Sequence, residues 1–116
     1  MSRWLAAFLL AAFLPAQSPD ATLSGIVTDP QGAVIVNAEV AVVNTATGVK
    51  TAARTNEAGF YALRFLSIGA YTLTAEQPGF RRYLRQGLTL TTGQTLALDV
   101  VLEVGAVTES VTVTSA

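Results

Sequence analysis

The sequence contains no cysteine and no histidine, and only 13% of its 116 residues are charged. Without cysteine there can be no disulfide framework and no thiolate nucleophile. Ser-His-Asp and Cys-His catalytic groups are excluded as well, together with zinc sites built on imidazole or thiolate. We therefore expect a protein that is not an enzyme and that carries no cofactor.

The chain also lacks a marked excess of basic or acidic residues, because its formal net charge is only −1. A chain without a basic excess has no electrostatic basis for binding nucleic acid, so no nucleic-acid partner is expected. Apolar residues make up 51% of the chain and its mean hydropathy is +0.47. This composition is too apolar for a disordered chain, and the length allows one domain.

Residues 1–16 have the features of a cleaved signal peptide. Arg3 supplies a positive charge, Trp4–Leu14 is an unbroken apolar run, and Pro15-Ala16 ends it at a small residue. The run is shorter than the roughly 20 residues that cross a bilayer, and no transmembrane helix is expected in the mature chain. With a linker at 17–20, the expected location is the periplasm or the outer membrane and cell surface of a Gram-negative bacterium. The alternative is a buried N-terminal helix.

Apolar residues of the remaining chain recur with a period of two, which is typical of half-buried strands. The most regular example alternates Leu96, Leu98, Val100 and Leu102 with more polar positions. Seven such strands lie about ten residues apart with turn signals between them. Residues 21–104 are therefore predicted to form an all-β, seven-stranded Greek-key β-sandwich.

Two turns carry side chains that can bond their own backbone. Asp29-Pro30-Gln31-Gly32 and Asn56-Glu57-Ala58-Gly59 both place an Asx residue first and glycine last. Asp29 and Asn56 are expected to accept hydrogen bonds within these turns. The alternative is a calcium site that also uses Glu57, but the spacing lacks the dense acidic pattern of a calcium loop.

Several motifs in order resemble the carboxypeptidase regulatory-like domain. They are Gly25-x-Val27-x-Asp29-x-x-Gly32, Ala38-x-Val40, Thr55-Asn56-x-x-Gly59-x-Tyr61-x-Leu63, Leu66-x-x-Gly69-x-Tyr71 and Pro78-Gly79-Phe80. The resemblance covers residues 21–103 and implies a transthyretin-like (prealbumin-like) or carbohydrate-binding-like sandwich without peptidase activity. The fourth motif also resembles a tyrosine corner, in which a tyrosine hydroxyl returns to the backbone.

A glycan-binding surface is one candidate site. Arg81, Arg82, Tyr83 and Arg85 could meet an acidic glycan, although a charged strand that discourages edge pairing is the favoured explanation of the arginines. Tyr61, Tyr71 and Phe80 have inward parity and are expected in the core, and the outward candidates among the aromatic residues are Phe60, Phe65 and Tyr83.

The tail at residues 105–116 is the other candidate site. Within it, Glu109, Ser110, Val111, Thr112 and Val113 resemble a TonB box, the segment that outer-membrane receptors offer to the TonB protein. An extended, β-branched peptide can add to the edge of a partner's sheet. The alternatives are an eighth strand of the sandwich and a free tail.

The resemblances together imply a function through protein contacts. A regulatory-like domain before a TonB box matches the N-terminal extension of a TonB-dependent, Oar-like outer-membrane receptor. Plug and barrel would follow the tail, so the chain is expected to be a fragment or a truncated form of such a receptor. The alternative is a free-standing secreted module for carbohydrate binding or adhesion.

Overall fold

The computed structural model describes residues 20–105 and 110–114. The predicted signal peptide, most of the predicted linker and Glu109 of the predicted TonB box lie outside these residues. In the described ranges every regular element is a strand, and no helix there is available to cross a membrane. The predicted all-β class is therefore confirmed.

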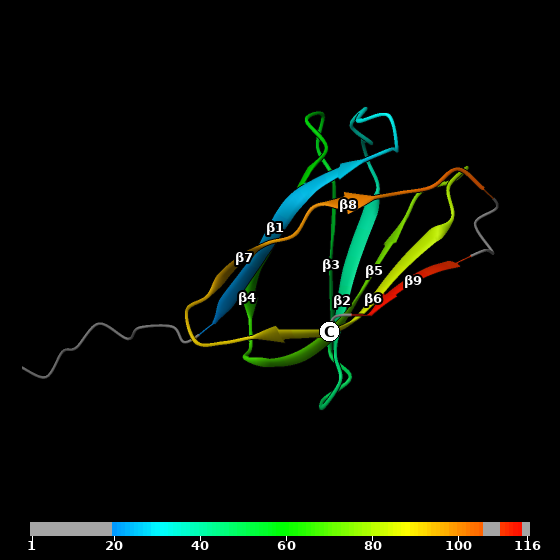
Figure 1. The fold of residues 1–116 in the computed structure, drawn as a ribbon. Coiled ribbons are helices and arrows are strands. Elements are labelled where there is room, and N and C mark those ends of the chain that lie inside the picture. The colour runs from blue at the N-terminus through cyan, green and yellow to red at the C-terminus, as the bar shows by residue number, and fades with distance from the viewer. Residues whose placement is uncertain (1–19, 106–109, 115–116) are drawn as a thin grey trace, which may run out of the picture.

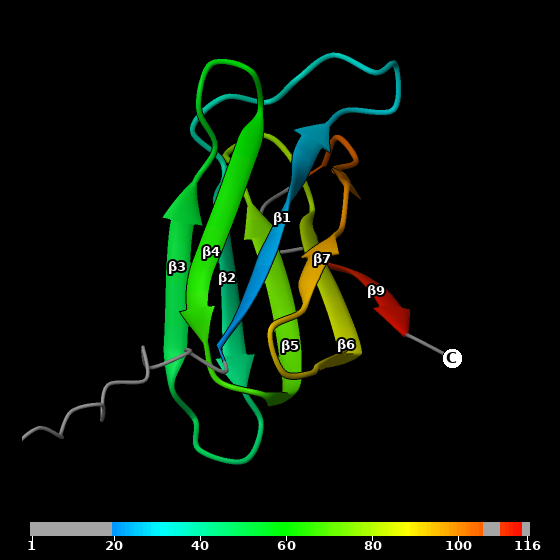
Figure 2. The same cartoon turned by 90° about the vertical axis from the view of Figure 1, so that its left-hand side faces the viewer.

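Two sheets pack face to face as a sandwich (Figures 1 and 2). One has the strand order β4-β1-β7, with β8 also pairing with β1, and the other has the order β3-β2-β5-β6-β9. The strands are β1 (Ala21–Thr28), β2 (Glu39–Asn44), β3 (Lys50–Arg54), β4 (Phe60–Leu66), β5 (Gly69–Glu76), β6 (Arg82–Leu90), β7 (Thr95–Ala97), β8 (Val100–Val101) and β9 (Ser110–Thr114).

The strand count differs from the predicted seven in two places. The predicted last strand is interrupted at Leu98 and Asp99, so that it becomes β7 and β8. The tail contributes β9, which pairs in parallel with β6 from Arg82↔Ser110 to Gln86↔Thr114. Of the alternatives for the tail, an additional strand is therefore what the structure contains.

The core lies between the sheets and follows the alternation in the sequence. In β5, for example, Tyr71, Leu73 and Ala75 are buried while the residues between them are partly exposed. Alternate residues of a strand point to opposite faces, so each sheet gives one apolar row to the interior. The largest fully buried side chains are Tyr61, Leu23, Leu63, Leu73, Leu90, Leu102, Val27, Val40, Val42 and Val100.

The interruption between β7 and β8 has a local cause at Gly25. A Cβ atom at this position would overlap the carbonyl group of Leu98, so the two backbones meet where only glycine fits. Tyr61, which pairs with Gly25 across β4 and β1, donates its hydroxyl to the same Leu98 oxygen at 2.6 Å. The Asp99 carboxylate then accepts the Ile26 N–H at 2.9 Å, a bond that a regular ladder would give to a carbonyl.

Two buried polar groups fix the connections between the sheets. The Tyr71 hydroxyl donates to the Ser67 carbonyl at 2.7 Å, which is the geometry predicted for the tyrosine corner. The Thr55 hydroxyl donates to the Ile35 carbonyl at 2.7 Å and accepts the Ala38 N–H at 2.8 Å. Thr55 thereby holds the long β1–β2 connection against the end of β3.

Candidate functional site

A row of charged side chains crosses the outer face of the five-stranded sheet near one end. Glu39 of β2 pairs in register with Arg54 of β3 on one side and with Glu76 of β5 on the other. Arg82 of β6 continues the row, and its Nε lies 3.2 Å from a Glu76 carboxylate oxygen. Neighbouring carboxylates repel each other, and the flanking arginines offset that repulsion.

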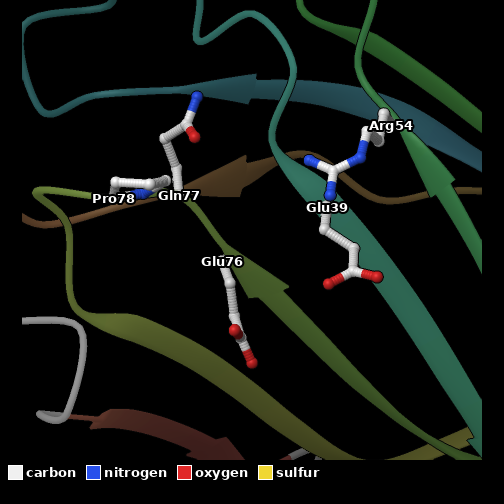
Figure 3. Close-up of a pocket in the computed structure, with 5 residues that line it drawn as sticks. All are labelled: Glu39, Arg54, Glu76, Gln77 and Pro78. Carbon is white, nitrogen blue, oxygen red and sulfur yellow. The ribbon is translucent and has the colours of Figure 1, made fainter.

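Three residues of this row, together with two that follow β5, enclose a shallow hollow of about 170 Å³, which is lined by Glu39, Arg54, Glu76, Gln77 and Pro78 (Figure 3). Its rim is held by side chains that bond the backbone of the β1–β2 connection. Gln77 Nε2 donates to the Val36 carbonyl at 2.7 Å, and Arg54 Nη1 donates to the Asn37 carbonyl at 3.0 Å. The Glu39 and Glu76 carboxylates point the same way, so the hollow offers hydrogen-bond acceptors beside a cation.

Metal binding has no support in the part of the chain that the structure describes. No group of three or more acidic, histidine or cysteine side chains converges there. Asp29 Oδ1 accepts the N–H groups of Gln31 and Ala33, and Asn56 Oδ1 accepts those of Ala58 and Phe60. The prediction that both Asx side chains bond their own turns is confirmed.

The predicted glycan surface of Arg81, Arg82, Tyr83 and Arg85 is not one surface. Tyr83 is only 8% exposed and belongs to the core, so its prediction as an outward aromatic residue is wrong. Tyr83 faces inward because it pairs with buried Ala75 of β5. Arg81 and Arg82 are exposed, and Arg82 belongs to the charged row instead.

Arg85 shares the inward parity of Tyr83, a feature that the sequence prediction missed. It pairs with Leu73 on one side and Val113 on the other, and its buried Nε has no hydrogen-bond partner. An extra residue in β6, where Gly87 has φ 78°, shifts the register beyond this point. The even spacing of Tyr83 and Arg85 was the signal that could have revealed the inward position.

Tyr61 is the described residue whose protonation the fold changes most clearly. Its ring is buried, and burial raises the pKa of its hydroxyl well above the ordinary value of 10.0. The negative charge of nearby Asp99 adds to this increase, while Arg85 opposes it. Because the hydroxyl donates to Leu98, Tyr61 is a neutral structural donor rather than a base.

The other aromatic predictions divide as follows. Phe60 and Phe65 are exposed, as expected, and Tyr61 and Tyr71 are buried. Phe80 is partly buried and packs against the core. The exposed aromatic residues are far apart along β4, which carries Phe60 at its start and Phe65 near its end. They do not form the flat aromatic platform on which a sugar ring would stack.

The TonB-box-like segment occupies the edge of the five-stranded sheet. Of its residues, Ser110, Val111, Thr112 and Val113 lie in β9. Val113 packs partly against the core, and Thr112 is exposed. In the described residues β9 pairs only with β6, so its second edge keeps unpaired N–H and C=O groups.

These features define a class of protein: all-β sandwich domains with an apolar core between the two sheets and polar residues on the outer faces. The model of the carboxypeptidase regulatory-like domain family matches residues 22–103, and the chain belongs to that family. A comparison with curated protein sequences gave no match. The family is one of non-catalytic regulatory domains.

Solved structures share the fold. Hydroxyquinol 1,2-dioxygenase from Pseudomonas putida is 11% identical with a TM-score of 0.62, over 78% of this chain and 58% of that one. The Bacillus anthracis TIE protein is 23% identical with a TM-score of 0.62, over 74% and 17%. A Bacteroides uniformis protein described as carbohydrate binding is 16% identical with a TM-score of 0.59, over 72% and 41%.

These likenesses concern the fold alone, because the identities are low. The chain spans between 17% and 58% of the lengths of these three structures. The sandwich therefore recurs as one part of larger proteins with different activities. The likeness to the Bacteroides uniformis protein agrees with the carbohydrate-binding-like fold that the sequence resemblance implied.

Proposed function

We propose that the chain is a non-catalytic, exported module that acts through protein contacts as the N-terminal extension of a TonB-dependent outer-membrane receptor. The observation that carries this proposal is the extended state of Ser110–Thr114 at a sheet edge with one side open. A strand in this state can pair with the edge of a partner's sheet through main-chain hydrogen bonds. Membership of the regulatory-like family supports the receptor context.

The test is a pull-down with the C-terminal domain of TonB. The full chain is expected to be retained, and a chain that ends at Gly105 is expected to be lost. Thr112→Pro should also abolish retention, because proline removes an N–H and disfavours strand pairing. Thr112→Ala is the matched control, since Thr112 is exposed and its side chain is not needed for main-chain pairing. Equal retention of the full and shortened chains would contradict the proposal.

Glycan binding in the outer-face hollow is the second candidate. It is favoured by a hollow whose carboxylates, guanidinium and amide could bond sugar hydroxyls. Calorimetric titration with a panel of neutral and basic glycans tests it, with Glu39→Gln as the variant expected to weaken any heat of binding. An absence of heat across the panel would remove this candidate while leaving the TonB proposal intact.

A further inference from the structure

One end of the sandwich exposes a group of apolar side chains that the proposed function does not use. Val49 is 62% exposed, Phe65 is 79% exposed and Ile68 is 51% exposed. We call these three residues the apolar tip. Val49 lies in the β2–β3 turn, Ile68 in the β4–β5 turn and Phe65 near the end of β4, and the two turns lie at the same end of the sandwich (Figure 2). Thr45 joins the β2–β3 turn to the start of β5, because its N–H and hydroxyl both donate to the Ala70 carbonyl, at 2.9 and 3.2 Å.

Phe65 is held outward by its backbone. Tyr61 and Leu63 point inward, so regular alternation would place Phe65 in the core as well. Instead Phe65 has φ 58°, and the register with β1 shifts between Ala21 and Leu23, after which Leu66 is buried. This left-handed conformation is unfavourable for a bulky residue, and strain of this kind is found at functional positions. The fold therefore exposes a large aromatic side chain that it could have buried.

Charge is distributed unevenly between the two ends. Lys50 and Arg64 are exposed next to the apolar tip, and Asp20, before β1, is the acidic residue at that end. The β1–β2 and β3–β4 connections at the opposite end carry Asp29 and Glu57. The apolar tip thus has a small positive excess in a chain of net negative charge.

We infer that the apolar tip inserts into the surface of a phospholipid bilayer with anionic headgroups. Aromatic and aliphatic side chains on turns can enter the boundary between headgroups and acyl chains, while basic residues beside them meet phosphates. The bilayer is favoured over a protein partner because the three exposed side chains lie in or beside the turns at one end of the sandwich and not in the middle of a flat sheet face.

Sedimentation with vesicles tests this inference. The exported chain is expected to sediment with vesicles of equal parts phosphatidylglycerol and phosphatidylcholine. Phe65→Gly should lower the partition coefficient by about tenfold or more, as expected from losing one buried aromatic side chain. Glycine adopts positive φ readily, so this variant should melt at the same or a higher temperature. Loss of binding would then not be a result of unfolding.

Matched variants make the outcome specific. Ile68→Ser should weaken sedimentation, whereas Val104→Ser should not, although Val104 is 71% exposed outside the tip. Phe65→Trp should retain binding and show a blue shift of the added fluorescence when vesicles are present. No sedimentation of the wild type, or equal sedimentation of wild type and Phe65→Gly, would overturn the inference. These results do not depend on whether the tail binds TonB.

Discussion

Gly25 is the residue at which β1 packs most closely against the segment between β7 and β8. It faces the Leu98 carbonyl so closely that even a methyl group cannot be accommodated. We predict that Gly25→Ala lowers the free energy of unfolding by at least about 3 kcal/mol, because β1 must move away from Leu98. Urea denaturation measures the loss.

Gly32→Ala is the matched control for this prediction. Gly32 has positive φ but open space around its Cβ direction, so the expected cost is only the backbone strain of about 1 kcal/mol. If the two variants were equally stable, close approach would not be the reason for glycine at position 25.

Tyr61 makes the stability depend on pH in the alkaline range. Its pKa is raised in the folded state, so the stabilisation is complete below the ordinary value of about 10 and is lost as the pH rises above it. Tyr61→Phe should be less stable at neutral pH by about 1–2 kcal/mol, because the Leu98 carbonyl loses its donor.

The difference between wild type and Tyr61→Phe should narrow as the pH rises above about 10. Thermal unfolding of both proteins across the alkaline range provides the measurement. A difference that stays constant with pH would show that Tyr61 does not remain protonated in the fold.

At the scale of elements, the pairing of β9 with β6 can be trapped covalently. Leu84 and Thr112 are register partners on neighbouring parallel strands. The chain has no cysteine of its own, so Leu84→Cys combined with Thr112→Cys should give one disulfide after mild oxidation. Mass spectrometry with and without reductant detects it.

Leu84→Cys combined with Val111→Cys is the control pair, because adjacent residues of a strand point to opposite faces. It should form little intramolecular disulfide, and equal yields from the two pairs would contradict the register. The locked form also tests how TonB would engage the tail. Retention of the locked form would indicate pairing on the open edge of β9, and its loss would indicate that β9 must leave β6.

For the whole molecule, the core belongs to the strands before the tail. Among the residues whose burial the structure describes, the fully buried side chains all lie between Ala21 and Leu102, and the partly buried Val113 is the β9 residue that packs against the core. A chain that ends at Gly105 should therefore still melt cooperatively, with a Tm lowered by less than about 8 °C. Calorimetry would show a broad, non-cooperative transition if β9 were essential to the sandwich.

Most of the fold could be predicted from local patterns. The alternation of Leu96, Leu98, Val100 and Leu102 identified inward positions correctly, although it did not reveal the break at Leu98. The Asx turns were also correct because Asp29 and Asn56 bond atoms within four residues. The candidate sites were predicted less accurately, because Tyr83 and Arg85 were judged by residue type and not by their cross-strand partners.

The amino-acid sequence was sufficient to establish the strand class, the turns, the family resemblance and the absence of histidine and cysteine chemistry. These properties depend on side-chain type and on spacing over a few residues. The three-dimensional arrangement was needed to show that β9 covers β6 and that Tyr61 reaches Leu98. Each of these depends on segments far apart in the chain meeting at one register, and the energy of such a meeting is not encoded in any local pattern.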